Sequence, residues 1–389
     1  MASTSTMSKH LELESTWINL QSSSRKAGPI HNLIHMKMQL NIILTLVVLL
    51  LTSGTAKAQL GQESRVATTA APFLTLGVGA KGTSLGHANT VYVSGAEALF
   101  WNPAGISVRN EGDSYASTFI SISEYFVDVN IYGTGIVIPV GRKEGQSIGI
   151  GLNYIDYGRM DVRTVEMQEG TGATFGSHDL SLGLTYAQNL TDSFHFGTTV
   201  KYVQQKIYDM VSEAVAVDMG FLLKTDYLNG LTIGASITNF GQDMTMRGNN
   251  TEAYVDLDPI SEGNNDGIIS NVKLNNWELP LSFRFGLMLP AIKRDNFEFL
   301  LLSEVQQTND NQINLDSGTQ LSYLTNTVKL HLRGGYRDLF LGDNVDSHLT
   351  YGAGFTLRSS SGIAIGVDFS HVPFQYLGQT STIDIKLYY

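Results

Sequence analysis

The fold class of this chain is decided by the stretch Gly362-Ile363-Ala364-Ile365-Gly366-Val367-Asp368-Phe369. Its large apolar side chains occupy every second position. In an extended strand such positions share one face, while glycine, alanine and aspartate occupy the other. The same alternation recurs over residues 180–187, 281–289 and 328–333. A pattern repeated along most of the chain after residue 110 indicates an all-β fold whose sheet has two unlike faces.

The lengths of the connections distinguish the two architectures that such a sheet permits. In a soluble sandwich the apolar face forms the core, whereas in a membrane barrel it faces lipid and the other face lines the lumen. Every second connection is short, as at 190–191 and 325–326, and the others reach the length of 241–279. A sandwich has no reason to sort its loops in this way. We therefore expect a transmembrane outer-membrane β-barrel of about fourteen antiparallel strands, with the soluble sandwich as the alternative.

The fourteen expected strands form an even number, as single-chain bacterial barrels have. They lie near 113–122, 126–139, 146–157, 178–189, 193–206, 212–225, 230–240, 280–290, 296–307, 317–324, 327–337, 347–358, 362–371 and 380–389.

The last of these strands, 380–389, is expected to pair with the first and close the barrel. Lipid offers no hydrogen-bond partner, so both edges of the sheet must meet. The side chains expected on its lipid-facing side are Ile383, Ile385, Leu387 and Tyr389. Asp384 and Lys386 are expected to point into the lumen. Because the lumen is expected to hold water or a paired charge, an arginine should be tolerated better at Asp384 than at Ile385.

The composition excludes several other classes of protein. Of 389 residues, 16% are charged and the net charge is −11, whereas soluble domains carry about 25% charged residues. So acidic a chain is a poor partner for nucleic acid. The absence of cysteine removes disulfide scaffolds, thiolate catalysis and thiolate metal sites. No apolar run reaches the roughly 20 residues of a transmembrane helix.

The N-terminal region resembles an export signal. Residues 40–51 are apolar except for Asn41 and Thr45, and the run is preceded by Lys37 and followed by Ala56-Lys57-Ala58. A short apolar run before a small-x-small cleavage pattern is typical of a secretory signal peptide. We therefore assign residues 1–58 to a signal-peptide region cleaved after Ala58. Residues 1–35 form a longer segment than the basic region that normally opens a signal peptide, so translation is expected to begin at Met36.

This assignment predicts the N-terminus of the exported protein. The membrane-inserted form should begin at Gln59, because signal peptidase cleaves after the small residue that ends the pattern. N-terminal mass spectrometry of the purified outer-membrane fraction tests this expectation. Intact Met1 or Met36 in that fraction would contradict export by this route.

Residues 59–110 precede the barrel, which is assigned to residues 111–389, and residues 71–108 do not alternate. We expect them to form a compact plug inside the lumen, because glycine lets backbone pack closely. The Gly77-x-Gly79 pair lacks the strand–loop–helix context and acidic residue of a nucleotide-binding loop. Asn102-Pro103-Ala104-Gly105 is a turn signature that lets the chain leave the plug. The residues expected to shape the plug are Gly77, Gly79, Gly86, Asn102, Pro103, Ala104 and Gly105.

The same segment resembles a known family. The segment 73–88, the motif Trp101-Asn102-Pro103-Ala104-Gly105 and the stretch Tyr154-Ile155-Asp156-Tyr157-Gly158 are similar to the PorV/PorQ family of outer-membrane proteins, relatives of the FadL fatty-acid transporters. Residues 236–241, Ser-Ile-Thr-Asn-Phe-Gly, fit as well. The resemblance implies a fourteen-stranded barrel with an internal N-terminal segment. It also implies work with the type IX secretion machinery, in which PorV accepts cargo proteins that carry a conserved C-terminal domain.

Titratable residues on the lumen face are expected to pair across strands and fix the register, the alternative being a polar conduit or proton relay. They are Lys201, Asp218, Arg284, Glu298, Glu304, Lys329, His331, Arg333, Arg358, Asp368, Asp384 and Lys386. The histidines, such as His195 and His348, have no serine and carboxylate in a recognisable motif, so no catalytic residue and no enzyme activity are assigned. Acidic residues in the loop 241–279 make a calcium site conceivable, but their spacing matches no EF-hand. No metal or cofactor is assigned.

Three hypotheses about function follow from these features, and one of them is a structural barrel with no transport role. The leading hypothesis is a non-enzymatic outer-membrane barrel of the PorV/PorQ type, with membrane lipid, the secretion translocon and cargo proteins as partners. The loops 160–177 and 241–279 are long enough to grip a protein. The alternative is a FadL-like transporter of small hydrophobic molecules, which needs an apolar lumen pocket supplied by Met288, Leu300 and Leu302.

Overall fold

The computed structural model describes residues 68–109, 116–141, 145–256, 267–339, 348–374 and 376–389. All of them belong to Ala58–Tyr389, the second of two compact units of the chain. The expected signal peptide, its cleavage after Ala58 and the start at Met36 lie outside the described residues. Within the described part of the chain, no helix is both long enough and apolar enough to cross a membrane.

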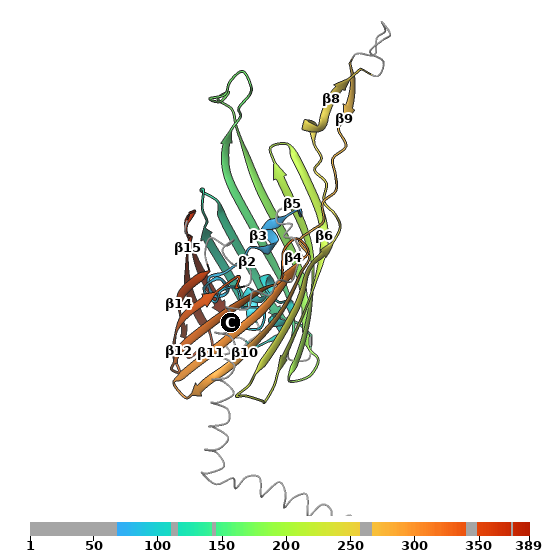
Figure 1. Ribbon diagram of the computed structural model, residues 1–389. Helices are drawn as coiled ribbons and strands as arrows, with labels where there is room; N and C mark the ends of the chain where they lie inside the picture. The colour runs from blue at the N-terminus through green and yellow to red at the C-terminus, as the bar shows by residue number, and fades with distance from the viewer. Residues whose placement is uncertain (1–67, 110–115, 142–144, 257–266, 340–347, 375) are drawn as a thin grey trace, which may run out of the picture. The chain divides into compact units, whose positions relative to one another are not determined.

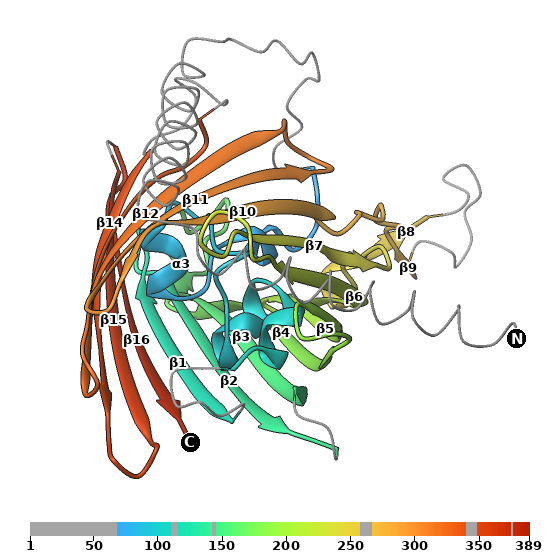
Figure 2. The same cartoon turned by 90° about the horizontal axis from the view of Figure 1, so that it is seen from below.

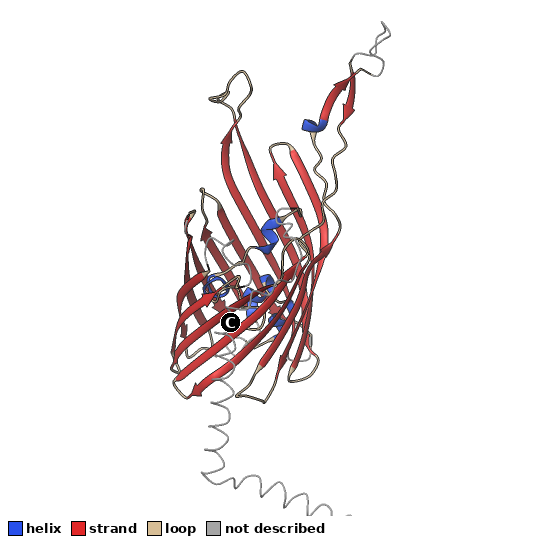
Figure 3. Ribbon diagram, viewed as in Figure 1, coloured by secondary structure: helices blue, strands red, loops and turns tan. Residues whose placement is uncertain are grey.

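Fourteen antiparallel strands form a closed barrel, as the alternation predicts (Figures 1 and 3). Strands that follow one another in the chain pair with each other, β7 pairs with β10 across a long connection, and β16 pairs with β1. The barrel strands are β1 (Ser117–Glu124), β2 (Asn130–Pro139), β3 (Gln146–Asp161), β4 (Thr174–Asn189), β5 (Phe194–Ile207), β6 (Met210–Lys224), β7 (Thr232–Gly241), β10 (Ser282–Arg294), β11 (Phe297–Thr308), β12 (Asn314–Leu324), β13 (Val328–Tyr336), β14 (Leu349–Arg358), β15 (Ala364–Phe374) and β16 (Gly378–Tyr388).

A separate two-stranded sheet stands on the connection between β7 and β10. It consists of β8 (Glu252–Val255) and β9 (Ile268–Asn271), after a turn of 3₁₀ helix, η4 (Asn249–Thr251). Figure 1 shows this hairpin extending beyond the rim of the barrel. The strand alternation does not predict it, because each strand has only four residues and lies in a polar loop. We call the rim that carries this hairpin the loop-side rim, and the opposite rim, with the short connections, the turn-side rim.

The last strand closes the barrel as expected. β16 pairs with β1 over eight residue pairs, from Ser117–Tyr388 to Glu124–Ser381. Ile383 and Ile385 are each about half exposed on the outer face, at 52% and 51%. Large apolar side chains cover the same face of the other strands, as a lipid-facing belt requires.

The N-terminal segment lies inside this barrel, as the view along the axis shows (Figure 2). We call residues 68–109 the plug. It contains four short helices: η1 (Pro72–Thr75), α3 (Ala80–Ser84), η2 (Gly95–Phe100) and η3 (Pro103–Ser107). Most of its buried apolar side chains form a cluster with lumen-facing Leu300 and Leu302, while Met288 packs against that cluster half-buried. Leu300 and Leu302, two of the three side chains that the transport hypothesis requires, are therefore engaged in holding the plug.

The closing strand gives a sharp test of which side faces lipid. Ile385→Arg should put a charge near the middle of the bilayer, at a cost of about 2–4 kcal/mol. The exposed Gln379 at the loop-side start of β16 is the control, because the same change there lies near the interface. Heat-modifiable migration on SDS gels should show loss of the closed barrel for Ile385→Arg alone. Normal closure of Ile385→Arg would contradict a lipid-facing position.

The sequence-based expectation for Asp384 needs correction. Asp384 is fully buried and faces neither water nor open lumen. Its Oδ2 accepts a hydrogen bond of 2.6 Å from the backbone N–H of Ala80, the first residue of α3. An arginine there would clash with the plug, so Asp384→Arg is no longer expected to be the milder change.

Candidate functional site

The first feature that bears on function is the set of contacts between the plug and the barrel wall, which we call the seat of the plug. The motif Asn102-Pro103-Ala104-Gly105 fixes one end of it. The Asn102 side chain accepts a hydrogen bond of 3.1 Å from the Ala104 N–H and so caps η3. Its amide donates to the carbonyl oxygens of Thr90 at 2.9 Å and Phe221 at 3.1 Å. The motif is therefore more than a turn, because it joins the plug to strand β6.

Two small barrel residues make room for this motif. A side chain on Gly197 would contact the carbonyl group of Pro103, and one on Gly220 would contact the Asn102 side-chain oxygen. Pro103 to Ser107 are all buried. The backbone of β5 at Gly197 and of β6 at Gly220 therefore lies directly against the motif.

The three glycines singled out from the sequence outside the Asn102 motif also lie at close contacts. Gly77 lies against the Trp101 ring, where a Cβ would come within 3.0 Å of it. Gly79 has φ of +103° and precedes α3, beside Asp384. Gly86 has φ of +66°, and a Cβ there would lie 2.8 Å from the Ser317 carbonyl oxygen of the barrel. Each position favours glycine through backbone conformation or close approach.

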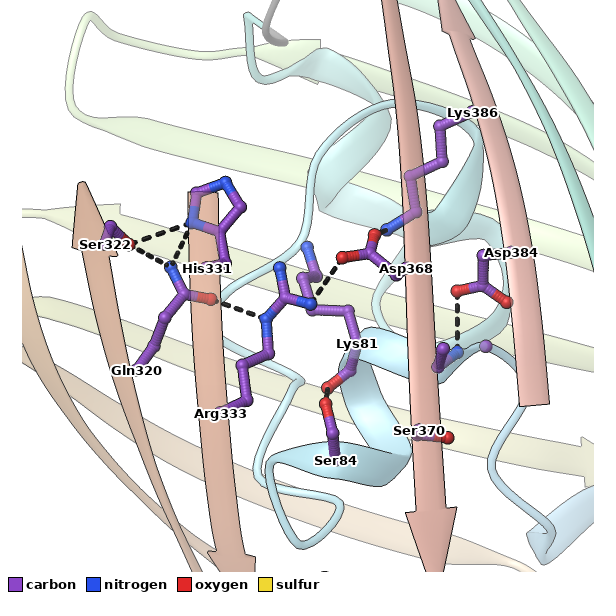
Figure 4. Close-up of polar contacts among 12 residues, drawn as sticks. Lys81, Ser84, Gln320, Ser322, His331, Arg333, Asp368, Ser370, Asp384 and Lys386 are labelled. Atoms are coloured by element: carbon purple, nitrogen blue, oxygen red, sulfur yellow. Dashed lines mark hydrogen bonds and ion pairs between the residues drawn. The ribbon is translucent and has the colours of Figure 1, made fainter. Parts of the chain in front are cut away.

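A chain of buried charges holds the plug on the opposite wall. Glu97 of the plug accepts from Lys81 Nζ at 3.1 Å and from Lys386 Nζ of β16 at 2.6 Å. Lys386 also lies 2.8 Å from Asp368 of β15, which in turn pairs with Arg333 of β13. Figure 4 shows Arg333, Asp368 and Lys386 converging beside α3. Charges buried at this depth are stable only when paired and hydrogen-bonded.

Hydrogen bonds that involve uncharged side chains extend the same network. Arg333 Nε donates to the Gln320 side-chain oxygen at 2.7 Å, and the Gln320 amide donates to Tyr92 of the plug at 2.9 Å. On α3, the Thr83 hydroxyl lies 2.7 Å from that of Ser370. The plug is thus tied to β12, β13 and β15 by side chains, not only by apolar contact.

The pKa values within the plug follow from burial and pairing. Burial alone would raise the pKa of Glu97, but Lys386 and Lys81 outweigh it and hold that pKa below its usual range. Burial lowers the pKa of Lys81, and the Glu97 carboxylate opposes this. Burial, together with Arg337 and Arg284, lowers the pKa of His87 to about 3. At neutral pH, Glu97 is therefore ionised and His87 is uncharged.

The expected pairing of lumen charges is present. Lys201 of β5 lies 2.9 Å from Asp218 of β6, and Arg284 of β10 lies 3.8 Å from Glu304 of β11. Glu304 also accepts two hydrogen bonds of 2.8 Å from Thr90 of the plug.

Sequence reasoning missed the two plug residues of the charge network. Lys81 and Glu97 are the only Asp, Glu, Lys or Arg between residues 68 and 108. Isolated charges in an otherwise apolar, glycine-rich segment were a usable signal, because each must find a partner once buried.

A small cavity lies beside the plug. It lies between the plug and strands β3 to β7, with Leu76, Leu99 and Phe100 on one side and Ser181 and Thr199 on the other. Its volume is about 70 Å³. A cavity of about 150 Å³ is what holds a molecule of benzene. In this arrangement the space is therefore too small for an aromatic or fatty ligand.

The loop-side rim is the second feature that bears on function. Backbone hydrogen bonds of 2.8 and 2.9 Å between Met244 and Trp277 close the base of the long connection. Above them the hairpin exposes apolar side chains, with Tyr254 77% and Ile269 59% accessible. Val272 is 56% accessible. These residues lie beyond the lipid-facing strands, so lipid does not account for their exposure.

The described residues bear on two kinds of chemical site, a hydrolase-like serine–histidine pair and a metal centre. The Ser107 hydroxyl lies 3.0 Å from His195 Nδ1, but His195 Nε2 has no hydrogen-bond partner, so no carboxylate orients this pair as in a hydrolase. Within the described ranges no three His, Asp or Glu side chains are grouped to hold a metal ion. Part of the acidic loop considered for calcium, residues 257–266, lies outside those ranges.

Comparison with known proteins gives a fold, and a family match over part of the chain. Residues 59–224 match the model of a family described as type IX secretion system protein PorV. No curated protein matches the chain. The toluene transporter TodX of Pseudomonas putida is similar at 14% identity and a TM-score of 0.50, covering 80% of this chain and 96% of that one. The monoaromatic hydrocarbon channel CymD is similar at 11% identity and a TM-score of 0.50, covering 80% and 96%. Identities this low show a shared fold alone.

Proposed function

We propose that this chain is a FadL-like outer-membrane β-barrel of the PorV family and that it binds proteins of the type IX secretion pathway at its loop-side rim. The partners we propose are the secretion translocon and secreted cargo. Family and fold are those of secretion and transport barrels, and we propose no enzymatic role.

The observation that carries this proposal is the hairpin β8–β9. An isolated two-stranded hairpin is marginally stable in water, and this one exposes Tyr254, Ile269 and Val272 outside the membrane belt. Exposed apolar side chains held on a protruding element are typical of a protein-binding surface. Two short strands also present open edges, which an extended peptide can extend by main-chain hydrogen bonds.

The plug supports the same choice. It is held by ion pairs on one wall and by the Asn102 motif on the other. The apolar side chains that a transporter would offer to a ligand are packed against it, and the cavity beside β3 to β7 measures about 70 Å³. A barrel whose lumen holds a plug in this way, and whose larger cavity of about 310 Å³ is lined by lysine and arginine side chains, is better suited to present its rim than to pass small hydrophobic molecules.

A chromosomal hairpin replacement in the native host tests the proposal. Residues 249–274 are replaced by a short glycine–serine turn, which keeps the paired base at Met244 and Trp277. The control strain carries a similar turn in place of residues 162–173, the connection between β3 and β4. Heat-modifiable migration verifies that both barrels are closed. The surface proteome and the uptake of toluene are then compared with those of wild-type and deletion strains.

We expect the hairpin strain to lose surface proteins to the same extent as the deletion strain, with uptake of toluene unchanged. The control strain should retain most of them. An intact surface proteome in the deletion strain, together with impaired toluene uptake, would overturn the proposal in favour of hydrophobic transport.

A further inference from the structure

A second cavity, of about 310 Å³, opens at the other end of the plug. Lys224 ends β6, Lys329 is the second residue of β13, and Arg358 ends β14, so all three lie at the turn-side rim. Arg109 follows η3 and lines the same cavity. These four cations form the mouth of the cavity, which we call the turn-side vestibule.

The floor of the vestibule is the charge network of the plug seat. Lys81, Arg333 and Lys386 line it, and Asp368 is the only acidic side chain among its described lining residues. Asp368 Oδ1 is taken by Arg333, and its Oδ2 lies 2.8 Å from Lys386. The single carboxylate of the lining is therefore paired with cations of the floor.

The sign of the charge on the lining side chains determines which ligands the cavity attracts. Arg109, Lys329 and Arg358 each have further contacts, and each contributes its positive charge to the lining together with them. A concave site lined by one sign of charge, with low-dielectric walls, focuses the field and concentrates ions of opposite sign.

From this arrangement we propose that the turn-side vestibule binds an anionic group with carboxylate or phosphate oxygens, presented from the turn side. The group is either a small anion or the acidic end of a peptide. Lys224 and Arg358 meet it first, because they stand at the ends of their strands. This site is independent of the proposed function, since the hairpin lies on the opposite rim.

Isothermal titration calorimetry on the full-length barrel, folded in a neutral detergent at low ionic strength, tests the proposal. The probes are inorganic phosphate and an acetylated triaspartate peptide, each titrated separately. The variant K224Q/R358Q removes two mouth charges without touching the ion pairs of the floor. The matched control is R294Q, which removes an exposed cation at the end of β10, outside the lining.

We expect wild type and R294Q to bind at least one probe equally, and K224Q/R358Q to bind it about tenfold more weakly. Added salt should weaken binding to wild type, because screening acts on charges near solvent. Tighter binding of the peptide would identify an acidic protein segment as the source, and tighter binding of phosphate a small anion. Failure of wild type to bind either probe, or equal binding by the double variant, would overturn the proposal.

Discussion

Gly335→Leu is expected to expel the plug from its seat while leaving the barrel closed. A Cβ on Gly335 would contact the backbone of Leu85 and Gly86, at the end of α3. Backbone cannot yield as a flexible side chain can, so the cost should reach or exceed the roughly 1–3 kcal/mol of ordinary overpacking. Hydrogen exchange of residues 72–108 should accelerate strongly, and planar-bilayer recordings should show conductance that wild type lacks.

The adjacent glycine provides the matched control. Gly334 lies on the same strand but points outward, and the nearest atom to a Cβ there is 3.9 Å away. Gly334→Leu should therefore leave exchange and conductance as in wild type, with both variants showing normal heat-modifiable migration. Equal behaviour of the two variants would mean that the plug does not depend on this close contact.

Glu97→Gln is expected to loosen the plug by a different route. The change removes the carboxylate shared by Lys81 and Lys386 and leaves buried ammonium groups short of a partner. Breaking a buried ion pair from one side costs about 3–5 kcal/mol. Hydrogen exchange of α3 and η2 should accelerate. The exposed Glu213 on the loop-side half of β6 serves as the control, and Glu213→Gln should not alter that exchange.

The same carboxylate makes the seat of the plug sensitive to acid. The pKa of Glu97 is lower in the folded protein than in the unfolded chain. Its contribution to stability is therefore fully present above its ordinary pKa and is lost as pH falls through the lower, folded value. Exchange of the plug in wild type should accelerate below about pH 4, and the Glu97→Gln variant should lack that part of the response. An identical acid response in both proteins would assign the effect to other groups.

Much of the fold could be predicted because lipid imposes a simple pattern. The alternation of Ile383, Ile385 and Leu387 with polar residues fixes which face of β16 is outside, and short connections fix the order of strands. The pairing of Lys201 with Asp218 follows from the same register, since cross-strand neighbours point the same way.

The seat of the plug could not be predicted in this way. Arg333 and Asp368 pair across an intervening strand, because Gly354 of β14 has no side chain to separate them, and neighbour rules do not anticipate this. The alternation places Asp384 on the inner face of the barrel, but its role as a partner of the Ala80 N–H depends on where the plug lies. Motifs such as Asn102-Pro103 indicated a turn, while their contacts with Phe221 depend on the closed barrel.

Photo-crosslinking from the hairpin in growing cells tests the central claim most directly. A photoreactive amino acid replaces Ile269 on β9, and in a second strain it replaces Leu332, which is 62% exposed on the lipid-facing side of β13. Adducts are identified by mass spectrometry after irradiation. The account predicts adducts of secreted proteins or of the secretion translocon from position 269, and none of these from position 332. A folded, surface-exposed barrel that yields no such protein adduct from position 269 would contradict it.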